Sequence, residues 1–160
     1  MANLLVMYAR GVWEFKYTGA TPKNAYLNHL LATDGTVPAN QIRFCYHYKH
    51  KINRIRLRGG EQRSDPIVDD TFKNMMERLD PEEFMEVRSG LIIHQTAIVD
   101  DGRMQRNGNR RVELVEPYEK YDKSGDCSQV KRVDVPKRRV STFQKWRAAY
   151  RQPEKNEIKR

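Results

Sequence analysis

The stretch PEEFMEVRSGLIIHQTAIVD, residues 81–100, alternates between apolar and polar residues, as a half-buried strand does. Its apolar residues are expected to face a core: Phe84, Val87, Leu91, Ile92, Ile93 and Ile98. Arg88-Ser89-Gly90 interrupts the apolar run, and Gly90 would let the backbone bend or approach another group closely. The run also holds four polar residues: Arg88, Ser89, His94 and Gln95. They indicate one of three things: a solvated strand face, a catalytic cluster or a contact surface.

Residues 41–60, QIRFCYHYKHKINRIRLRGG, predict two more strands, which are joined at Lys49-His50-Lys51 and end at the turn Gly59-Gly60. The first of these strands is expected to divide its side chains between an apolar face and a polar face. The apolar face would carry Ile42, Phe44, Tyr46 and Tyr48, and the polar face Arg43, Cys45 and His47. The second strand has apolar residues at Ile52, Ile55 and Leu57, with basic residues between them.

Further strands are predicted toward both ends of the chain. Residues 4–17, LLVMYARGVWEFKY, predict two strands around Arg10-Gly11. Residues 100–135 predict a hairpin with its tip at residues 122–126. Turn signals precede this hairpin at Asp101-Gly102 and at Asn107-Gly108.

Three helices are predicted between the strands and at the C-terminal end. Residues 21–35, TPKNAYLNHLLATDG, predict a short helix that Thr21 caps and Asp34-Gly35 ends. Residues 64–81 predict a second helix, with Asp65 as its cap and an apolar stripe of Val68, Phe72, Met75, Met76 and Leu79. Residues 136–151, PKRRVSTFQKWRAAYR, predict a third helix with one apolar side: Val140, Phe143, Trp146 and Tyr150.

These patterns indicate a mainly β fold with a few short helices, of the α+β class. The length of 160 residues suits one domain with a sizeable core. We expect residues 1–150 to form that domain, with an insertion at about residues 20–40. Residues 151–160 are expected to be a disordered basic tail.

The charge balance indicates the class of partner. The chain has 30 Lys and Arg against 21 Asp and Glu, a formal net charge of +9. Such a balance favours polyanionic partners, nucleic acid first, although ribosomal proteins and proteins of anionic membrane surfaces share it. The two cysteines, Cys45 and Cys127, make no disulfide framework, which favours a reducing cytoplasm. No signal peptide and no apolar stretch of membrane-spanning length is present, so we expect a cytoplasmic protein without a membrane partner.

Two kinds of chemical site are alternatives to nucleic-acid binding. Cys45, His47 and His50, joined by His94, have a loosely ligand-like spacing, but no paired CxxC accompanies them, so we expect no metal and no cofactor. The histidines could pair with Asp100 or Asp101 in a nuclease. No GxSxG, HExxH or P-loop pattern occurs, however, so we expect no enzyme and keep a nuclease as the alternative.

Basic residues gather at connections between the predicted elements. The runs are KHKINR at 49–54, VRSG at 87–90 and PKRRV at 136–140, with a fourth run, RMQRNGNRR, at 103–111. Any one run alone is equally well explained as a solvated strand face. Their clustering at connections in a basic chain favours a surface that contacts phosphates.

Four segments together resemble the LytTR-type bacterial DNA-binding domain. FMEVRSGLIIHQTAI, residues 84–98, is similar to its signature strand region, roughly F-x-R-V-H-R-S-Y-I-V-N-x-x-x-I. Residues 41–60 resemble the strand pair of the family, and residues 65–84 its helix that leads into the Phe. VDVPKRRVSTF, residues 133–143, resembles its closing V-S-R-R motif with the final helix. The resemblance covers about residues 40–150, with the motifs in the order of the family.

The resemblance implies an elongated, mainly β fold that binds duplex DNA through loops and strand ends in successive major grooves, often on direct repeats. Arg88 takes the place of the signature His, Ser89 that of the Arg, and Arg138 that of the second Arg in the closing motif. Lys49-His50-Lys51 corresponds to a third contacting loop. The family domain usually follows a receiver domain, and no acidic phosphorylation pocket precedes the match here, so we expect a free-standing, divergent member.

Departures from the signature indicate that the base preference differs. Arg88-Ser89-Gly90 replaces His-Arg-Ser, His94 replaces the usual Asn, and Pro136-Lys137-Arg138 replaces Ser-Arg-Arg. The planar fork of an Arg suits a guanine edge, so Arg88 and Arg138 are the candidates for reading bases. Phosphate contacts are expected from the others: Ser89, Lys137 and Arg139.

The function expected from the whole sequence is that of a sequence-specific regulator of transcription that binds double-stranded DNA and forms a dimer on it. An RNA-binding protein is a further alternative. RNA modules usually expose aromatic stacking platforms, whereas Phe44, Tyr46 and Tyr48 fall on the more apolar strand face here, which suits a core.

Overall fold

A computed structural model describes residues 28–61 and 64–150. The strands predicted at residues 4–17, the first part of the helix predicted at 21–35 and the tail at 151–160 lie outside these residues. The assignment of residues 1–150 to one domain and of 20–40 to an insertion therefore stays a prediction.

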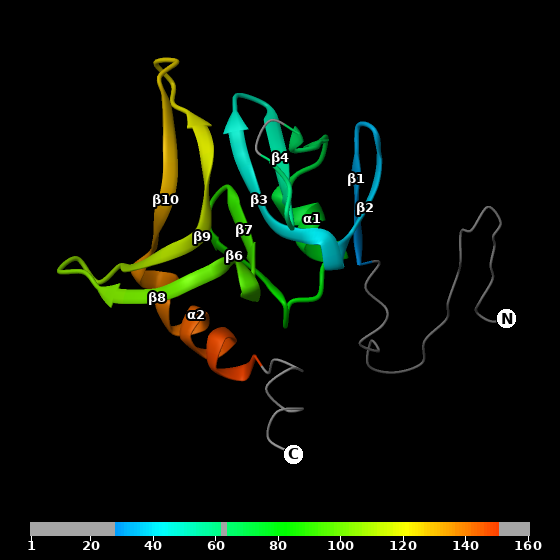
Figure 1. The fold of residues 1–160 in the computed structure, drawn as a ribbon. Helices are drawn as coiled ribbons and strands as arrows, with labels where there is room; N and C mark the ends of the chain where they lie inside the picture. Colours follow the sequence, from blue (N-terminus) through cyan, green and yellow to red (C-terminus); the bar gives the residue numbers. More distant parts are fainter. Residues whose placement is uncertain (1–27, 62–63, 151–160) are drawn as a thin grey trace, which may run out of the picture.

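Two antiparallel sheets make up most of the described fold, which confirms the mainly β class (Figure 1). The larger sheet has seven strands in the order β2-β1-β5-β4-β3-β7-β6. These strands are β1 (His29–Ala32), β2 (Gly35–Pro38), β3 (Ile42–Lys49), β4 (Ile52–Leu57), β5 (Ile67–Val68), β6 (Phe84–Arg88) and β7 (Leu91–His94). The smaller sheet has the order β10-β9-β8, formed by β8 (Ile98–Met104), β9 (Arg110–Tyr121) and β10 (Cys127–Val135).

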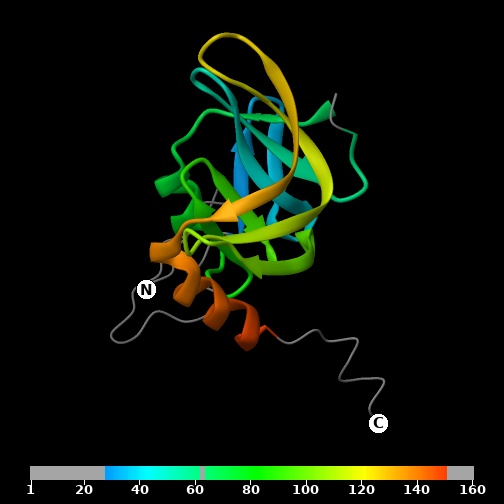
Figure 2. The ribbon, with the colours of Figure 1, turned by 90° about the vertical axis from the view of Figure 1, so that its left-hand side faces the viewer.

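Two α-helices cover the sheets within the described residues: α1 (Phe72–Arg78) and α2 (Lys137–Ala149). The predicted apolar side of α2 is confirmed, because Val140, Phe143 and Trp146 are buried. Figure 2 shows α2 below the strands of the smaller sheet, with the long β9–β10 hairpin rising away from it. That hairpin confirms the strand pair and the tip predicted from residues 100–135.

Residues 81–100 form a tight hairpin and then cross to the smaller sheet. β6 and β7 pair antiparallel around Ser89-Gly90, where Gly90 adopts a φ of +84° that an L side chain rarely takes. A short 3-10 helix, Gln95–Ala97, then leads into β8. The apolar residues of β6 and β7 are buried as predicted. Arg88 and Ser89, by contrast, are exposed to solvent at the turn of this hairpin.

β3 is buried on both faces, because the second sheet with α2 covers one side and α1 the other. Phe44 and Tyr46 pack in a core with Val112, Val135 and Phe143. Cys45 and Ile42 pack in a second core with Met75 and Leu79 of the α1 region. The prediction of a polar face with Cys45 was therefore wrong. Ile42 also lies on the face opposite to that predicted, because the register with β4 shifts between Ile42 and Phe44.

The helix predicted at residues 64–81 begins later than its cap signals indicated. Thr71 is its cap, and its side-chain oxygen accepts a hydrogen bond from the Asn74 N–H at 3.1 Å. Ile67–Val68 is instead the strand β5, which joins β4 to β1. Asp65 is buried beside Arg56, so the carboxylate that suggested a cap serves an ion pair.

Two turn signals were also misassigned. Residues 28–35 belong to the β1–β2 hairpin, with Asp34-Gly35 at its turn, and not to a helix. Its strands bury Leu30 and Val37 against the second core, and tertiary packing thus overrides the helical spacing of the sequence. Asp101-Gly102 is a bulge within β8, where the register with β9 shifts between Asp100 and Arg103.

His94 has a structural role at the end of β7. Its Nδ1 accepts a hydrogen bond from the Thr96 N–H at 3.0 Å, and its Nε2 lies 3.0 Å from Glu83 Oε1. The accepted bond places the imidazole proton on Nε2, which donates to the carboxylate. Burial lowers the pKa of His94, and the nearby Arg58 guanidinium acts in the same direction.

This burial predicts acid sensitivity of the fold. In the unfolded chain His94 takes up a proton as the pH falls below about 6.5, whereas the folded protein keeps it neutral to lower pH. The unfolded state therefore binds more protons in this window, and the free energy of unfolding falls as the pH falls. His94→Gln should make the decline between about pH 7 and 5.5 shallower. Urea unfolding at several pH values measures this, with His50→Gln at an exposed turn as the control; equal slopes in both variants would contradict the prediction.

In the described part of the chain, neither helix has the length and apolar character needed to cross a membrane.

Candidate nucleic-acid interface

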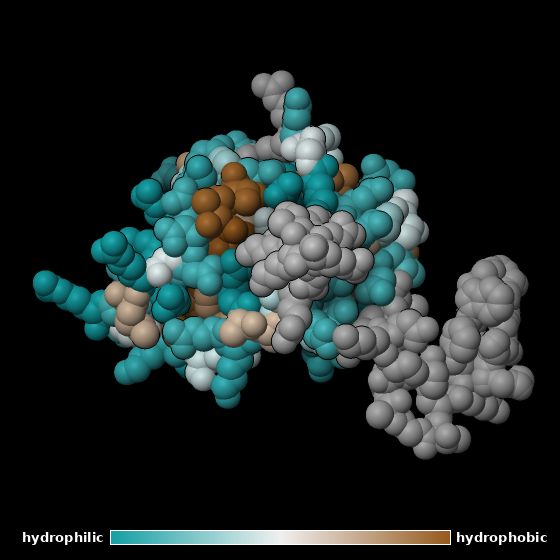
Figure 3. Space-filling model, turned by 60° about the horizontal axis from the view of Figure 1, so that its bottom comes forward, coloured by the Kyte–Doolittle hydropathy of each residue, from teal (hydrophilic) through white to brown (hydrophobic). Residues whose placement is uncertain are grey.

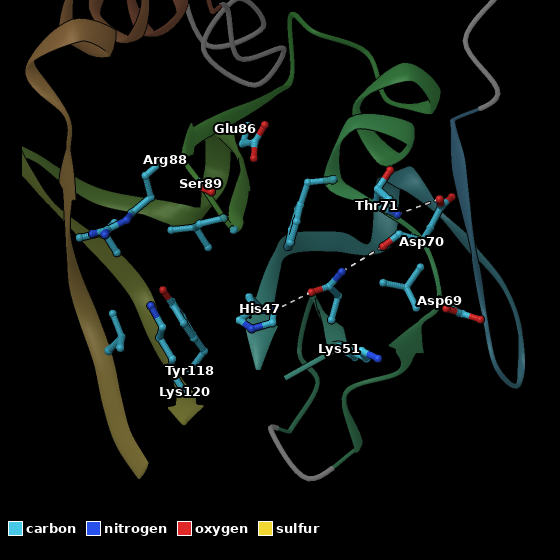
Figure 4. Close-up of a pocket in the computed structure, with 17 residues that line it drawn as sticks. His47, Lys51, Asp69, Asp70, Thr71, Glu86, Arg88, Ser89, Tyr118 and Lys120 are labelled. Atoms are coloured by element: carbon cyan, nitrogen blue, oxygen red, sulfur yellow. Dashed lines mark hydrogen bonds between the residues drawn. The ribbon is translucent and has the colours of Figure 1, made fainter. Parts of the chain in front are cut away.

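Two turns and one strand that are far apart in the sequence meet around one hollow of about 900 Å³ (Figure 4). The β3–β4 turn contributes Lys51, the β6–β7 turn contributes Arg88 and Ser89, and β9 contributes Lys120. Two of the basic runs singled out in the sequence, 49–54 and 87–90, are thus brought together. Lys51, Arg88, Ser89 and Lys120 are all exposed, so these groups are available to a partner.

Backbone pairing fixes the two turns relative to one another. The His47 N–H at the end of β3 donates to the Gly90 carbonyl at 3.0 Å. The His47 ring lies 3.0 Å from the Asn53 side-chain oxygen, and the Asn53 amide donates to the Asp70 carbonyl (Figure 4). These bonds hold the walls of the hollow in place without using the basic side chains.

Arg88 lies at the smaller-sheet side of the hollow, pointing toward β9 and β10 in Figure 4. Burial raises the pKa of Tyr118 to about 12, and the positive charge of Arg88 acts against this rise. Arg88 itself stays exposed, so its guanidinium is available to a partner.

Lys49 and His50, the other predicted residues of the β3–β4 turn, are exposed but do not line the hollow. Lys49 Nζ lies 5.6 Å from the ring centroids of both Tyr48 and Tyr121, which couples the turn to the end of β9. His50 is exposed, and Lys51 adopts a φ of +60° that reverses the chain direction. The structure thus places all three predicted residues at the solvent-exposed end of the β3–β4 pair.

The third predicted run, at the start of α2, does not line the hollow. Lys137 and Arg138 are exposed, and Arg139 is half-buried. Arg139 Nη1 donates to the Glu86 carbonyl of β6 at 2.9 Å, two residues before Arg88. The contact fastens the beginning of the helix to the edge strand that carries Arg88, which fixes the orientation of Lys137 and Arg138.

The hollow also has acidic groups and is therefore not uniformly basic. Asp69, Asp70 and Glu86 line it. Asp70 Oδ1 is engaged locally, because it accepts from the Thr71 N–H and from the Asn74 amide at 2.8 Å. Lys51, Arg88 and Lys120 can bind phosphates, and the carboxylates can accept from amino groups.

Lys120 was not identified from the sequence. Its neighbour two positions earlier, Tyr118, is buried, so the alternation of a strand places both side chains on the same face of β9. The alternation along β9 can be read from the sequence, but it does not show which other element this face of β9 contacts. The position of Lys120 beside Arg88 follows only from the packing of the two sheets.

The candidate metal and catalytic residues are not assembled within the described part of the chain, where no group of three His, Cys, Asp or Glu is placed to hold a metal. Burial raises the pKa of the Cys45 thiol to about 12, whereas His50 is exposed. His47 pairs with an amide and not with a carboxylate. The His94–Glu83 pair is a carboxylate contact, but its imidazole is buried and holds the start of the 3-10 helix.

Two antiparallel sheets, a closing helix that packs on the edge strand and basic turns at the strand ends define the class of fold as that of the LytTr DNA-binding domain. A solved structure with this fold is the LytTr DNA-binding domain of a methyl-accepting/DNA response regulator from Bacillus cereus. It aligns with a TM-score of 0.51 at 15% sequence identity, over 76% of this chain and 95% of that one. The resemblance read from the four sequence motifs is therefore confirmed for the fold. No family model and no curated protein matches this chain in sequence.

Proposed function

We propose that this protein is a sequence-specific regulator of transcription that binds double-stranded DNA through its basic turns. The observation that carries the proposal is the convergence of Lys51, Arg88, Ser89 and Lys120 around one hollow, on the fold of a DNA-binding domain. The formal net charge of +9 supports a polyanionic partner.

The side chains divide into those that read bases and those that hold the DNA backbone. Arg88 and Arg138 are proposed to enter the major groove, where the guanidinium fork can meet two acceptors of a guanine. Phosphate contacts are proposed for Lys49, His50, Lys51, Ser89 and Lys137. Arg139 is proposed to act mainly by orienting the start of α2, since its guanidinium already binds the Glu86 carbonyl.

The wider regulatory behaviour is proposed from the class of fold. Binding to direct repeats, with two protein copies side by side on the DNA, would extend the small contact area of one domain. Sedimentation of the protein with duplexes that carry one or two sites would separate a monomer from a dimer on DNA.

Selection of duplexes from a random library, followed by a gel shift, tests the function. We expect the selected duplex to be bound about 10³-fold or more tightly than a scrambled duplex of equal length. Single-stranded DNA, double-stranded RNA and a reaction with Mg²⁺ are run in parallel. Preference for RNA, or cleavage of the duplex, would replace the proposal by one of its two alternatives, and equal affinity for selected and scrambled duplexes would contradict sequence-specific binding.

Binding should also weaken steeply with salt. If about six phosphates are neutralised, the logarithm of the association constant falls with the logarithm of salt concentration with a slope of about −5. Fluorescence anisotropy between about 50 and 200 mM salt should then show a loss of roughly 10³-fold. A slope near zero would contradict the assignment of the basic turns to phosphates.

A further inference from the structure

The fourth basic run, residues 103–111, lies against the start of α2 in the folded protein. The β8–β9 turn is closed by hydrogen bonds from the Gln105 N–H to the Asn109 carbonyl and from the Gly108 N–H to the Gln105 carbonyl. Asn107 strengthens it, because its side-chain oxygen accepts from the Asn109 N–H at 3.0 Å. Figure 1 shows the turn projecting beyond the body at the end of β8 and β9.

A side chain of this turn caps the helix. Pro136 is the cap residue of α2 and has no side-chain acceptor. The Asn109 side-chain oxygen supplies one from another element, accepting from the Lys137 N–H at 2.9 Å. This bond satisfies one of the free N–H groups at the helix start, and it fixes the turn relative to α2.

Gly108 lies directly under the aliphatic stem of Lys137. A Cβ atom at position 108 would come within 2.7 Å of Lys137 Cδ and 2.9 Å of Lys137 Cγ. The stem of Lys137 therefore runs along the β8–β9 turn, and this turn also carries Arg106. Arg106, Lys137 and Arg138 are exposed, and the ion pairs of the described residues include none of them.

From this packing we propose that the β8–β9 turn is a further contact with the phosphate backbone of duplex DNA, in which Arg106 acts together with Lys137 and Arg138. The inference rests on the proposed function and extends the contact surface from the hollow to a second place on the molecule. A turn held by its own hydrogen bonds loses little conformational freedom on binding, which favours its use as a contact. A hydrophilic side chain projects at the left-hand edge of Figure 3, beside a more apolar patch, and Met104 at the end of β8 is exposed.

Neutralisation of the turn tests its charge. Arg106→Ala should weaken binding to the selected and the scrambled duplex by the same factor, roughly threefold to tenfold, because a phosphate contact carries no base information. The slope of the salt dependence should become shallower by about 0.9, corresponding to one phosphate. The control is Lys145→Ala, which removes one exposed positive charge farther along α2 and should leave the salt slope unchanged.

A pair of glycine variants tests the position of Lys137 without changing any charge. Gly108 and Gly125 both have a φ of +90°, so alanine strains the backbone equally at the two turns. At Gly108 the new methyl group would displace the Lys137 stem, whereas at Gly125 nothing lies within 4 Å. Gly108→Ala should weaken DNA binding by several-fold relative to Gly125→Ala, with similar losses of melting temperature in both.

The outcomes separate this inference from the proposed function. If the wild-type protein binds the selected duplex and Arg106→Ala retains both its affinity and its salt slope, the contact at the β8–β9 turn is refuted and the function stands. Equal affinities of the Gly108→Ala and Gly125→Ala variants would also count against it. If the wild-type protein binds no duplex, both the function and this contact fall.

Discussion

Arg88→Ala is expected to weaken binding to the selected duplex by about 1–3 kcal/mol, roughly fivefold to 150-fold. Arg88 is exposed at the end of β6, where the turn to β7 and the hydrogen bond from His47 to Gly90 hold its backbone in place. The substitution removes the guanidinium fork that would meet two acceptors on a base edge. Because no buried contact is lost, the melting temperature should change little.

The charge-conserving variant separates base reading from simple attraction. Arg88→Lys keeps the positive charge but loses the planar fork, so the affinity for a scrambled duplex should hold while the preference for the selected duplex declines. Arg138→Ala should show the same loss as Arg88→Ala if the start of α2 also reads a base. Anisotropy titrations with both duplexes measure these differences, and unchanged affinity in both alanine variants would refute the assignment of the reading residues.

Arg56→Met is expected to lower the free energy of unfolding by about 3–5 kcal/mol. Arg56 of β4 is only 2% exposed, and its Nε lies 2.9 Å from the buried Asp65. Its Nη1 donates to Glu116 Oε1 at 2.6 Å and to the Pro117 carbonyl at 2.9 Å, both on β9. Loss of the guanidinium would leave the carboxylate of Asp65 buried without its cation and would break the link between the two sheets.

The environment of Asp65 explains why the loss should be large. Burial raises the pKa of Asp65, and the bonds from Tyr46 and Arg56 act against that rise by favouring the ionised form. Without Arg56, the hydroxyl of Tyr46, 2.6 Å from Asp65 Oδ2, remains as the nearest donor on a side chain. Arg54, whose charge also favours the ionised carboxylate, would remain beside it, where it donates to the Asp65 backbone carbonyl at 3.1 Å. A buried carboxylate that has lost its paired guanidinium is still costly, because the surrounding protein solvates charge poorly.

Urea unfolding measures the effect, and two further variants sharpen it. Arg111→Met removes an arginine whose pair with Asp134 is exposed and screened by solvent, and it should destabilise the protein far less. The double variant Arg56→Met with Asp65→Leu should regain part of the lost stability, because it removes the stranded charge as well. A loss after Arg56→Met as small as that after Arg111→Met would contradict a structural role for the buried pair.

Local sequence signals predicted the elements whose turn residues or apolar spacing are self-contained. The β9–β10 hairpin and α2 follow directly from their turn residues and apolar spacing. β1 did not, because Leu30 and Leu31 are adjacent and fit a helix and a strand equally well, so packing against the second core decides. α1 was extended too far, because Asp65 and Pro66 imitate a helix start while Asp65 in fact pairs with Arg56.

For the candidate interface too, the sequence predicted the local runs of basic residues but not which of them meet in the fold. The basic runs at residues 49–54 and 87–90 were visible in the sequence, because charge concentrated at the connections between strands. The meeting of Lys51 with Arg88 depends on the pairing of β3 with β7, and that of Arg88 with Lys120 on the stacking of the sheets. Arg54 and Arg56 look alike in the sequence, yet only the second is almost wholly enclosed.

The hydrogen bond from the His47 N–H to the Gly90 carbonyl has a consequence for how the recognition of DNA can change over evolution. It joins the β3–β4 and β6–β7 turns through backbone atoms, so replacing a side chain on either turn leaves the distance between them as it was. A protein that reads DNA with these two turns would therefore acquire a new preferred base while keeping the old spacing between the bases it reads. Divergent relatives should differ in the bases that they prefer in their target sites, whereas the spacing between those bases should be the same in all of them.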